Sequence, residues 1–334
     1  MNFILGPSLF DSGSRLQLVR LWGASVDQRH RVEIPKATES IWATWRSELD
    51  EGTREQLDGG LTWSVHENAK RPSGICIFVE KKVASAWSKH ELTLDDAVDL
   101  ASRPFRIFLE NAASDGQFLR TLLTQDERVW FDDLVEREWL LLETAGGVTE
   151  IGKRIAWARE KEARLLRVAA LFDGDAVEPP ASKNESEKDF RARLHINSRK
   201  ALDACKQAQL GDVDAFPHHV TRRRAIENYL PITALERWVK SVGAQERESC
   251  QKRVEALKAF PRKHEFNMKK GHGGDRRRSP AATWLPANRN TRLEEGFGAD
   301  IATQFEKVGS DELKADGSFD EFRSFIHALR RRIS

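Results

Sequence analysis

The amino-acid sequence predicts an α/β protein in which a parallel sheet is flanked by helices. The main observation is that apolar segments rich in β-branched and aromatic residues alternate with amphipathic segments through the middle of the chain. Such an alternation implies parallel strands joined by right-handed helical crossovers. The third predicted strand, residues 166–172, is nearly all apolar, as expected of a strand covered on both faces. A length of 334 residues with 40% hydrophobic residues excludes disordered, collagen-like and rod-shaped proteins.

We divide the chain into three regions. Residues 1–102 are expected to form an N-terminal α+β region, in which a helix over residues 39–49 and a strand over residues 75–80 carry no recognisable chemistry. Residues 103–230 are expected to form the central α/β domain. Residues 231–334 are expected to be mostly helical and basic.

The first strand of the central domain is predicted over residues 105–109. Ser114 and Gln117 have the spacing of a capping box, which predicts a helix from Ser114 through Leu123. A second strand is predicted over residues 138–142, and the Gly146-Gly147 pair predicts a turn after it.

The rest of the domain continues the alternation. Thr149 is expected to cap a helix that continues to about Glu162, and the third strand follows it. A polar loop, and then one long helical segment that ends near residue 209, complete the domain. Helices are also predicted over residues 231–242 and 322–333 of the C-terminal region.

Acidic residues follow two of the predicted strands. Glu110 comes directly after the first strand, and Asp173 and Asp175 come after the third. Ligands bind beyond the carboxyl ends of parallel strands, so these carboxylates are expected to converge if the two strands are neighbours. Converging carboxylates repel each other unless a cation neutralises them, and oxygen ligands favour Mg²⁺ or Mn²⁺. For each residue alone, a turn acid on the surface is the alternative.

The stretch from Phe105 to Leu230 resembles the Toprim domain of topoisomerases, primases and the OLD family of nucleases, and the OLD-like nucleases most of all. The resemblance rests on four segments: residues 108–119, an acid after a strand and then a helix; residues 143–151, a glycine-rich turn; residues 172–175, with the Asp-Gly-Asp sequence; and residues 222–230, an arginine followed by Ile-Glu-Asn-Tyr-Leu. The family usually has glycine where this chain has Asn111.

The resemblance implies a Toprim-type, Rossmann-like catalytic domain over residues 103–230. It also implies phosphodiester hydrolysis with one or two Mg²⁺ or Mn²⁺ ions. Glu110 would be a metal ligand or general base, Asp173 and Asp175 would be metal ligands, and Glu227 would be a further acid at the metal site. The alternative for Glu227 is an ion pair with one of the arginines at 222–224.

Other members of the wider Toprim group fit less well. The only tyrosine, Tyr229, lies in a segment expected to be packed, which argues against a topoisomerase nucleophile. The cysteines do not form the zinc ribbon of a bacterial primase. The chain also lacks a GxxxxGK[ST] phosphate-binding loop, so any ATP would be used by a separate ABC-type ATPase subunit.

The resulting expectation is a stand-alone, metal-dependent endonuclease, a hydrolase that acts as the toxic effector of an antiviral, abortive-infection system. It would be a homodimer when active. The alternative is a non-catalytic Toprim-fold subunit that regulates or docks a nucleic-acid-processing complex. Whether DNA or RNA is the substrate stays open.

A basic stretch supports a nucleic-acid partner. Residues 252–292 contain twelve Lys or Arg and three acids, an excess of nine positive charges. Within it, a cationic loop is expected to neutralise phosphates through Lys269, Lys270, Arg276, Arg277 and Arg278. Lys269 or Lys270 is also expected to approach the scissile phosphate as a catalytic residue. The alternative is a solvated basic surface without a partner.

The chain is expected to be cytoplasmic. Its three cysteines are isolated, which is typical of a reducing compartment. No apolar run reaches the length needed to cross a membrane, so no membrane partner is expected.

Overall fold

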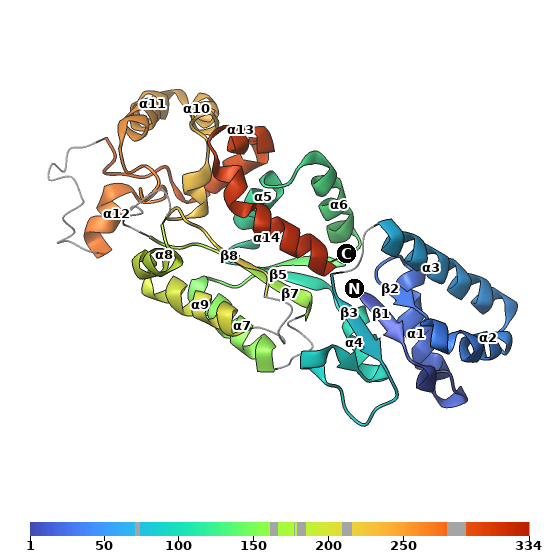
Figure 1. The fold of residues 1–334 in the computed structure, drawn as a ribbon. Coiled ribbons are helices and arrows are strands. Elements are labelled where there is room, and N and C mark those ends of the chain that lie inside the picture. The colour runs from blue at the N-terminus through green and yellow to red at the C-terminus, as the bar shows by residue number, and fades with distance from the viewer. Residues whose placement is uncertain are drawn as a thin grey trace.

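The computed structural model describes residues 1–70, 74–160, 166–176, 178, 185–208, 216–278 and 292–333 (Figure 1). Within these residues the strands form two four-stranded sheets, and every strand pair in both sheets is parallel. The predicted α/β class is therefore confirmed. None of the described helices is both long and apolar enough to cross a membrane.

The first sheet belongs to the N-terminal region and has the order β2-β1-β3-β4. The expectation of an α+β region is wrong, because helices alternate with these parallel strands along the chain. The predicted helix and strand of this region are present as α2 and β3. The elements are β1 (Asn2–Leu5), α1 (Arg15–Val26), β2 (Arg31–Glu33), α2 (Glu39–Ser47), α3 (Glu51–Lys70), β3 (Cys76–Val79), β4 (Glu91–Leu92) and α4 (Leu94–Ser102).

The second sheet has the order β6-β5-β7-β8 and carries the predicted acidic residues. Its strands are β5 (Phe105–Leu109), β6 (Leu140–Thr144), β7 (Val168–Phe172) and β8 (His218–Val220). Strand β5 lies between β6 and β7, with Ile107 opposite Leu142 on one side and Ala169 on the other. The first and third predicted strands are therefore neighbours, as the convergence of their acids requires.

Helices cover both faces of the second sheet (Figure 1). One face packs against α7 (Val148–Glu160) and α9 (Ile196–Gln207), and its core is continuous with that of the first sheet. The other face packs against α5 (Ala112–Thr121), α6 (Gln125–Glu136) and α14 (Ser318–Ile333). Nearly all side chains of β7 are therefore buried, which agrees with its apolar sequence.

Two boundaries differ from the prediction because of local backbone chemistry. Helix α5 begins at Ala112, and its N-cap is Asn111 rather than Ser114; the Asn111 Oδ1 accepts hydrogen bonds from the backbone N–H groups of Ala113 and Ser114. Strand β6 begins at Leu140 because Glu138 has a φ of +58°, which an extended strand cannot include.

The predicted long helical segment is two helices, α8 (Glu187–Arg193) and α9, because Leu194 and His195 have extended backbones between them. The His195 side chain caps α9.

The C-terminal region is mostly helical, as predicted. Its elements are α10 (Ile232–Ser241), α11 (Ala244–Ala259), α12 (Gly271–Arg278), the 3-10 helix η7 (Ala299–Lys307), α13 (Ser310–Ala315) and α14. The expected cationic loop is wrong in part, because residues 271–278 form helix α12. Gly271 permits the start of this helix: its φ is +65°, and a Cβ there would lie 2.3 Å from the Glu295 carbonyl carbon.

Candidate active site

A cavity of about 360 Å³ lies at the carboxyl ends of β5 and β7, between α5 and η7. Six acidic side chains line it, together with one lysine. These residues are Glu110, Asp115, Asp173, Glu227, Asp300, Glu306 and Lys269. The structure therefore brings together four of the residues predicted from the sequence, namely Glu110, Asp173, Glu227 and Lys269, and adds three further acids.

Glu110 and Asp173 are held against each other by the ends of their strands. The Glu110 Oε1 accepts a hydrogen bond from the Asp173 backbone N–H at 3.0 Å. The Asp173 Oδ1 in turn accepts one from the Ile226 backbone N–H at 2.9 Å. These bonds fix both carboxyl groups and connect them to the segment that carries Glu227.

Glu227 lies on the short 3-10 helix η6 (Ile226–Tyr229) and is 1% exposed. Its Oε1 is 2.9 Å from the Nζ of Lys269, whose side chain is 46% exposed. Of the two lysines expected to approach the scissile phosphate, only Lys269 lines this cavity. Lys270 is exposed and does not line the cavity.

Asp115 was not recognised from the sequence. It is 6% exposed in the first turn of α5, where its Oδ2 accepts a hydrogen bond from the Asn111 backbone N–H at 3.0 Å. The available signal was its position, because an acid in the first turn of α5 lies next to the end of the strand that precedes this helix and leads into Glu110. Asp300 and Glu306 of η7 also line the cavity and gave no sequence signal, because their contact with α5 is long-range.

Asp175 is close to this site but does not line the cavity. Its φ is +50°, and its backbone N–H donates to the Arg224 carbonyl at 2.8 Å. Gly174 allows the chain to turn here, because a Cβ on Gly174 would lie 2.5 Å from the Thr221 carbonyl oxygen. Asp175 therefore lies beside the cavity as a negative charge that acts on Glu110, and its role as a metal ligand stays a prediction.

The electrostatics of the cavity are those of crowded carboxyl groups. Burial raises the pKa of Glu110 to about 7, and the charges of Asp175 and Asp115 add to this effect. Burial also raises the pKa of Asp173 well above its ordinary value, with contributions from Glu110 and Glu227. Burial alone would lower the pKa of Lys269, but the Glu227, Asp173 and Glu110 carboxylates raise it. The site thus has an excess of negative charge.

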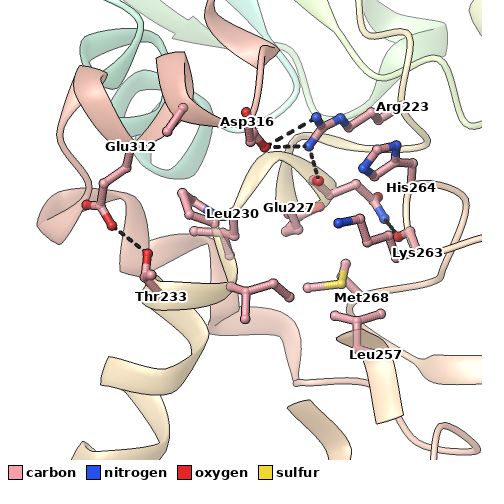
Figure 2. Close-up of a pocket in the computed structure, with 14 residues that line it drawn as sticks. Arg223, Glu227, Leu230, Thr233, Leu257, Lys263, His264, Met268, Glu312 and Asp316 are labelled. Atoms are coloured by element: carbon pink, nitrogen blue, oxygen red, sulfur yellow. Dashed lines mark hydrogen bonds and ion pairs between the residues drawn. The ribbon is translucent and has the colours of Figure 1, made fainter. Parts of the chain in front are cut away.

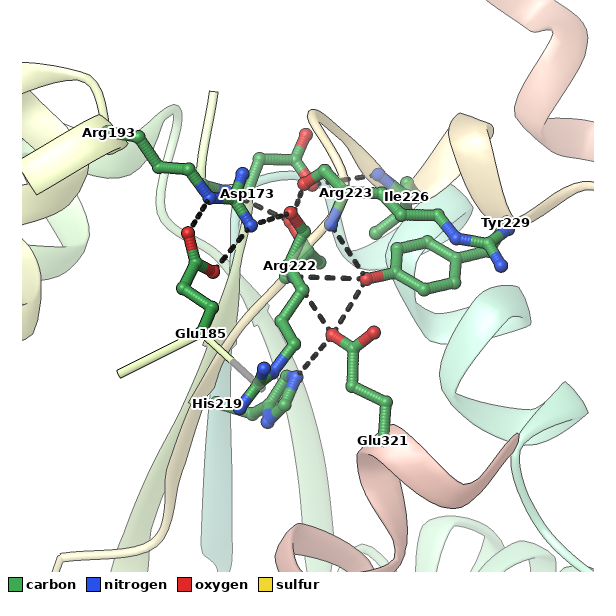
Figure 3. A network of polar contacts seen from close by, with 11 residues as sticks. Asp173, Glu185, Arg193, His219, Arg222, Arg223, Ile226, Tyr229 and Glu321 are labelled. Carbon is green, nitrogen blue, oxygen red and sulfur yellow. Dashed lines mark hydrogen bonds and ion pairs between the residues drawn. The ribbon is translucent and has the colours of Figure 1, made fainter. Parts of the chain in front are cut away.

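A buried polar network holds the segment that leads to Glu227 (Figure 3). The Tyr229 hydroxyl accepts hydrogen bonds from the backbone N–H groups of Arg222 and Arg223, each at 3.0 Å, and donates to Glu321 Oε1 at 2.7 Å. The same Glu321 oxygen contacts His219 Nε2 at 3.0 Å. Tyr229 is completely buried, so the segment that carries it is packed as predicted.

The alternative interpretation of Glu227, an ion pair with an arginine at 222–224, is wrong. Arg223 pairs with Asp316, and Arg224 makes a buried bidentate pair with Asp275 at 2.5 and 2.7 Å. The Arg222 guanidinium lies over the ring of Phe190. Arg224 and Asp275 instead attach α12 to the loop before η6.

The predicted nucleic-acid-binding residues are only partly described. The Arg276, Arg277 and Arg278 side chains lie outside the described part of the structure. Several other cations of the basic stretch pair with acids from outside it or at its edge; Lys252 pairs with Glu248, Arg253 with Glu295 and Lys258 with Glu236. These pairs reduce the free positive charge that the sequence count indicates.

The donor chemistry of the cavity fits a divalent cation. Six carboxyl groups and one ammonium group line it, so a hard cation would compensate the charge that raises the pKa values of Glu110 and Asp173. Among the described residues, no three acidic, His or Cys side chains are already arranged around a common metal position. Binding would therefore require the Glu110 or Asp173 carboxylate to change its rotamer or its backbone hydrogen bond.

A second cavity, of about 350 Å³, lies on the other side of Glu227 (Figure 2). Its walls are mainly apolar, with Leu230, Leu257 and Met268, and its rim carries the Arg223–Asp316 pair and His264. The consecutive residues Met268 and Lys269 face different cavities. Glu227 therefore lies in the wall between the two.

No protein-family model, curated protein or solved structure matches this chain.

Proposed function

We propose that the chain is a metal-dependent nuclease with a Toprim-type domain, which hydrolyses phosphodiester bonds in nucleic acid. The observation that carries this proposal is the gathering of Glu110, Asp115, Asp173 and Glu227 with Lys269 around one cavity at the carboxyl ends of adjacent parallel strands. Ligand sites of open parallel sheets lie at this edge. The described strand order and the positions of Glu110 and Asp173 also support the resemblance to Toprim proteins.

Glu110, Asp173 and Glu227 would hold one or two Mg²⁺ or Mn²⁺ ions. When bound, such an ion polarises a phosphate and lowers the pKa of a coordinated water. Asp115 adds negative charge beside these ligands, while its hydrogen bond to the Asn111 N–H fixes the start of α5.

Other groups of the protein have separate roles in the proposed reaction. The Lys269 side chain is half exposed and its ammonium group pairs with the buried Glu227, so it is placed to attract a phosphate into the cavity. Glu110 has a pKa of about 7 in the cation-free site, and a bound cation would lower this pKa. Glu110 would then be ionised near neutral pH, as either a metal ligand or a general base requires. The Tyr229–Glu321 network keeps the loop before Glu227 in place.

The test is incubation of purified protein with plasmid, linear DNA and total RNA, each with Mg²⁺ and with a chelator. We expect Mg²⁺-dependent cleavage of at least one substrate and its loss in Glu110→Gln. Cleavage that persists in Glu110→Gln, or that does not depend on metal, would remove this cavity from the reaction.

The non-catalytic alternative, a Toprim-fold regulatory or docking subunit, predicts nucleic-acid binding without cleavage. We further propose that a separate ATPase restrains the nuclease. Co-expression with an ATPase encoded beside it should then change the toxicity of the chain, and toxicity should depend on Glu110.

A further inference from the structure

A third cavity, of about 380 Å³, lies near the amino ends of β5 and β7, away from the carboxylate site. It is on the sheet face that α7 covers. Three arginines, one acid and an apolar wall line it: Arg103, Arg106, Arg167, Glu143, Pro104, Leu141 and Trp157.

Arg167 is the unusual member, because it is 2% exposed and its guanidinium has no carboxylate partner among the described residues. Its Nε and Nη2 donate to the Arg103 carbonyl at 3.2 and 3.1 Å, and its Nη1 is buried without an acceptor. A buried charge without a counter-ion is costly. Burial and the charge of Arg29 lower the pKa of Arg167 to about 9, so it stays protonated at neutral pH.

The surroundings add positive charge rather than compensating it. Arg29 donates to the carbonyls of Ser102 and Arg103, so two guanidinium groups share the Arg103 oxygen. The Glu143 carboxylate pairs with two arginines. Its Oε1 lies 3.1 Å from the Arg106 Nη1, and its Oε2 lies 3.1 Å from the Arg154 Nη1. The charged side chains of this group are five arginines and three acids, an excess of two positive charges. They are Arg29, Arg103, Arg106, Arg154 and Arg167 with Asp27, Asp99 and Glu143.

We propose that this cavity binds the phosphate group of a small ligand through Arg167, Arg106 and Arg103. Guanidinium groups suit phosphate because they donate paired hydrogen bonds to its oxygens. The cavity has room for more than a phosphate ion, and Pro104, Leu141 and Trp157 give it an apolar side. Free phosphate and the phosphate of a mononucleotide share the recognised chemistry, and the apolar side favours the mononucleotide. The inference is independent of the proposed nuclease activity.

The experiment is calorimetric titration of the full chain, in EDTA, with three probes: inorganic phosphate, adenosine monophosphate and adenosine. We expect the two phosphate compounds to bind, the nucleotide more tightly, and adenosine not to bind. Arg167→Met should weaken phosphate binding by about ten-fold or more. It should also leave the ligand-free Tm unchanged or higher, because an unpaired buried charge is removed. If Arg167→Met does not fold, Arg106→Gln provides the same test with a partly exposed residue.

Lys269→Met is the matched control, because Lys269 belongs to the carboxylate cavity and its loss should leave this binding unchanged. Three outcomes would overturn the proposal. One is no phosphate binding at millimolar concentration, and another is equal affinity in the parent, Arg167→Met and Arg106→Gln. The third is loss of binding in Lys269→Met, which would place the phosphate at the carboxylate cavity instead.

Discussion

Glu227 and Lys269 form an ion pair with one partner almost entirely buried and the other half exposed. The Oε1–Nζ distance is 2.9 Å, with exposed side-chain fractions of 1% for Glu227 and 46% for Lys269. Lys269 is the one cation among the described residues that line the carboxylate cavity. It therefore both compensates a buried charge and presents a positive group to solvent, where a phosphate would enter.

Replacing Lys269 should affect stability and activity together. Lys269→Met leaves the Glu227 carboxylate buried without its ion pair, which should lower the free energy of unfolding at neutral pH by about 1–3 kcal/mol. Urea denaturation measures this loss, and cleavage should fall in the same variant. Lys270→Met is the control, because Lys270 is exposed and does not line the cavity. Equal effects of the two substitutions would contradict the special position of Lys269.

The raised pKa of Glu110 predicts how the stability of the metal-free protein depends on pH. Its folded-state pKa of about 7 lies above its ordinary value of 4.5, so the folded protein binds more protons than the unfolded chain between these values. Its contribution to stability is therefore lost as the pH rises from about 4.5 to 7. Glu110→Gln should remove this loss and stabilise the metal-free protein at pH 8 by on the order of 1–3 kcal/mol. Thermal unfolding of the parent and of Glu110→Gln between pH 5 and 8 in a chelator measures this difference. Parallel curves of Tm against pH for the two proteins would show that Glu110 does not have a raised pKa.

The hydroxyl of Tyr229 should matter for the loop that carries Glu227. Tyr229→Phe leaves the Arg223 backbone N–H without its acceptor, while Arg222 N–H can still donate to Glu321. We expect a loss of about 1–3 kcal/mol in the free energy of unfolding, and slower cleavage. Glu321→Gln keeps an oxygen acceptor and should cost less. A Tyr229→Phe protein as stable and active as the parent would mean that the network does not position the loop.

The proposed nucleic-acid-binding surface can be tested at the three arginines that end α12. Changing Arg276, Arg277 and Arg278 to Ala should weaken binding about equally for all sequences. On duplex DNA, the slope of log K against log salt should become shallower by about 0.9 for each phosphate that the variant no longer neutralises. Fluorescence anisotropy at several salt concentrations measures both quantities. Unchanged affinity and slope would show these residues to be a solvated surface.

The sequence was sufficient where a local pattern decides the structure. The apolar run of β7 predicted a strand covered on both faces. The acids after β5 and β7 predicted two members of the cavity on the condition that these strands are neighbours, because parallel strands end at one edge, and the structure meets this condition. Lys269 and Glu227 were predicted as candidates without their pairing. That pairing joins residues 42 positions apart and depends on how the C-terminal region folds back, which no local pattern contains.

The predictions that the structure corrects failed because they depend on contacts that a local sequence pattern does not show. Asn111 rather than Ser114 caps α5 because its side chain reaches two backbone N–H groups, so the cap lies three residues earlier than predicted. The residues around Gly271 looked like a loop from their glycines and charges. They form a helix because Asp275 is buried against Arg224 and His272 is buried beside Phe260 and Phe266. The parallel order of the N-terminal sheet is a long-range property of short strands with little sequence signal.

The most direct test of the central claim is the calorimetric affinity of Mn²⁺ for the parent protein and for Asp173→Asn. The substitution keeps the shape of the side chain and an oxygen that can accept from the Ile226 N–H, but removes one negative charge from the cavity. We expect the parent to bind Mn²⁺ and Asp173→Asn to bind it about ten-fold more weakly or worse. Asp203→Asn, which changes an acid of α9 paired with Arg191, should bind Mn²⁺ as the parent does. Equal Mn²⁺ affinity in the parent and in folded Asp173→Asn would show that this cavity is not a metal site.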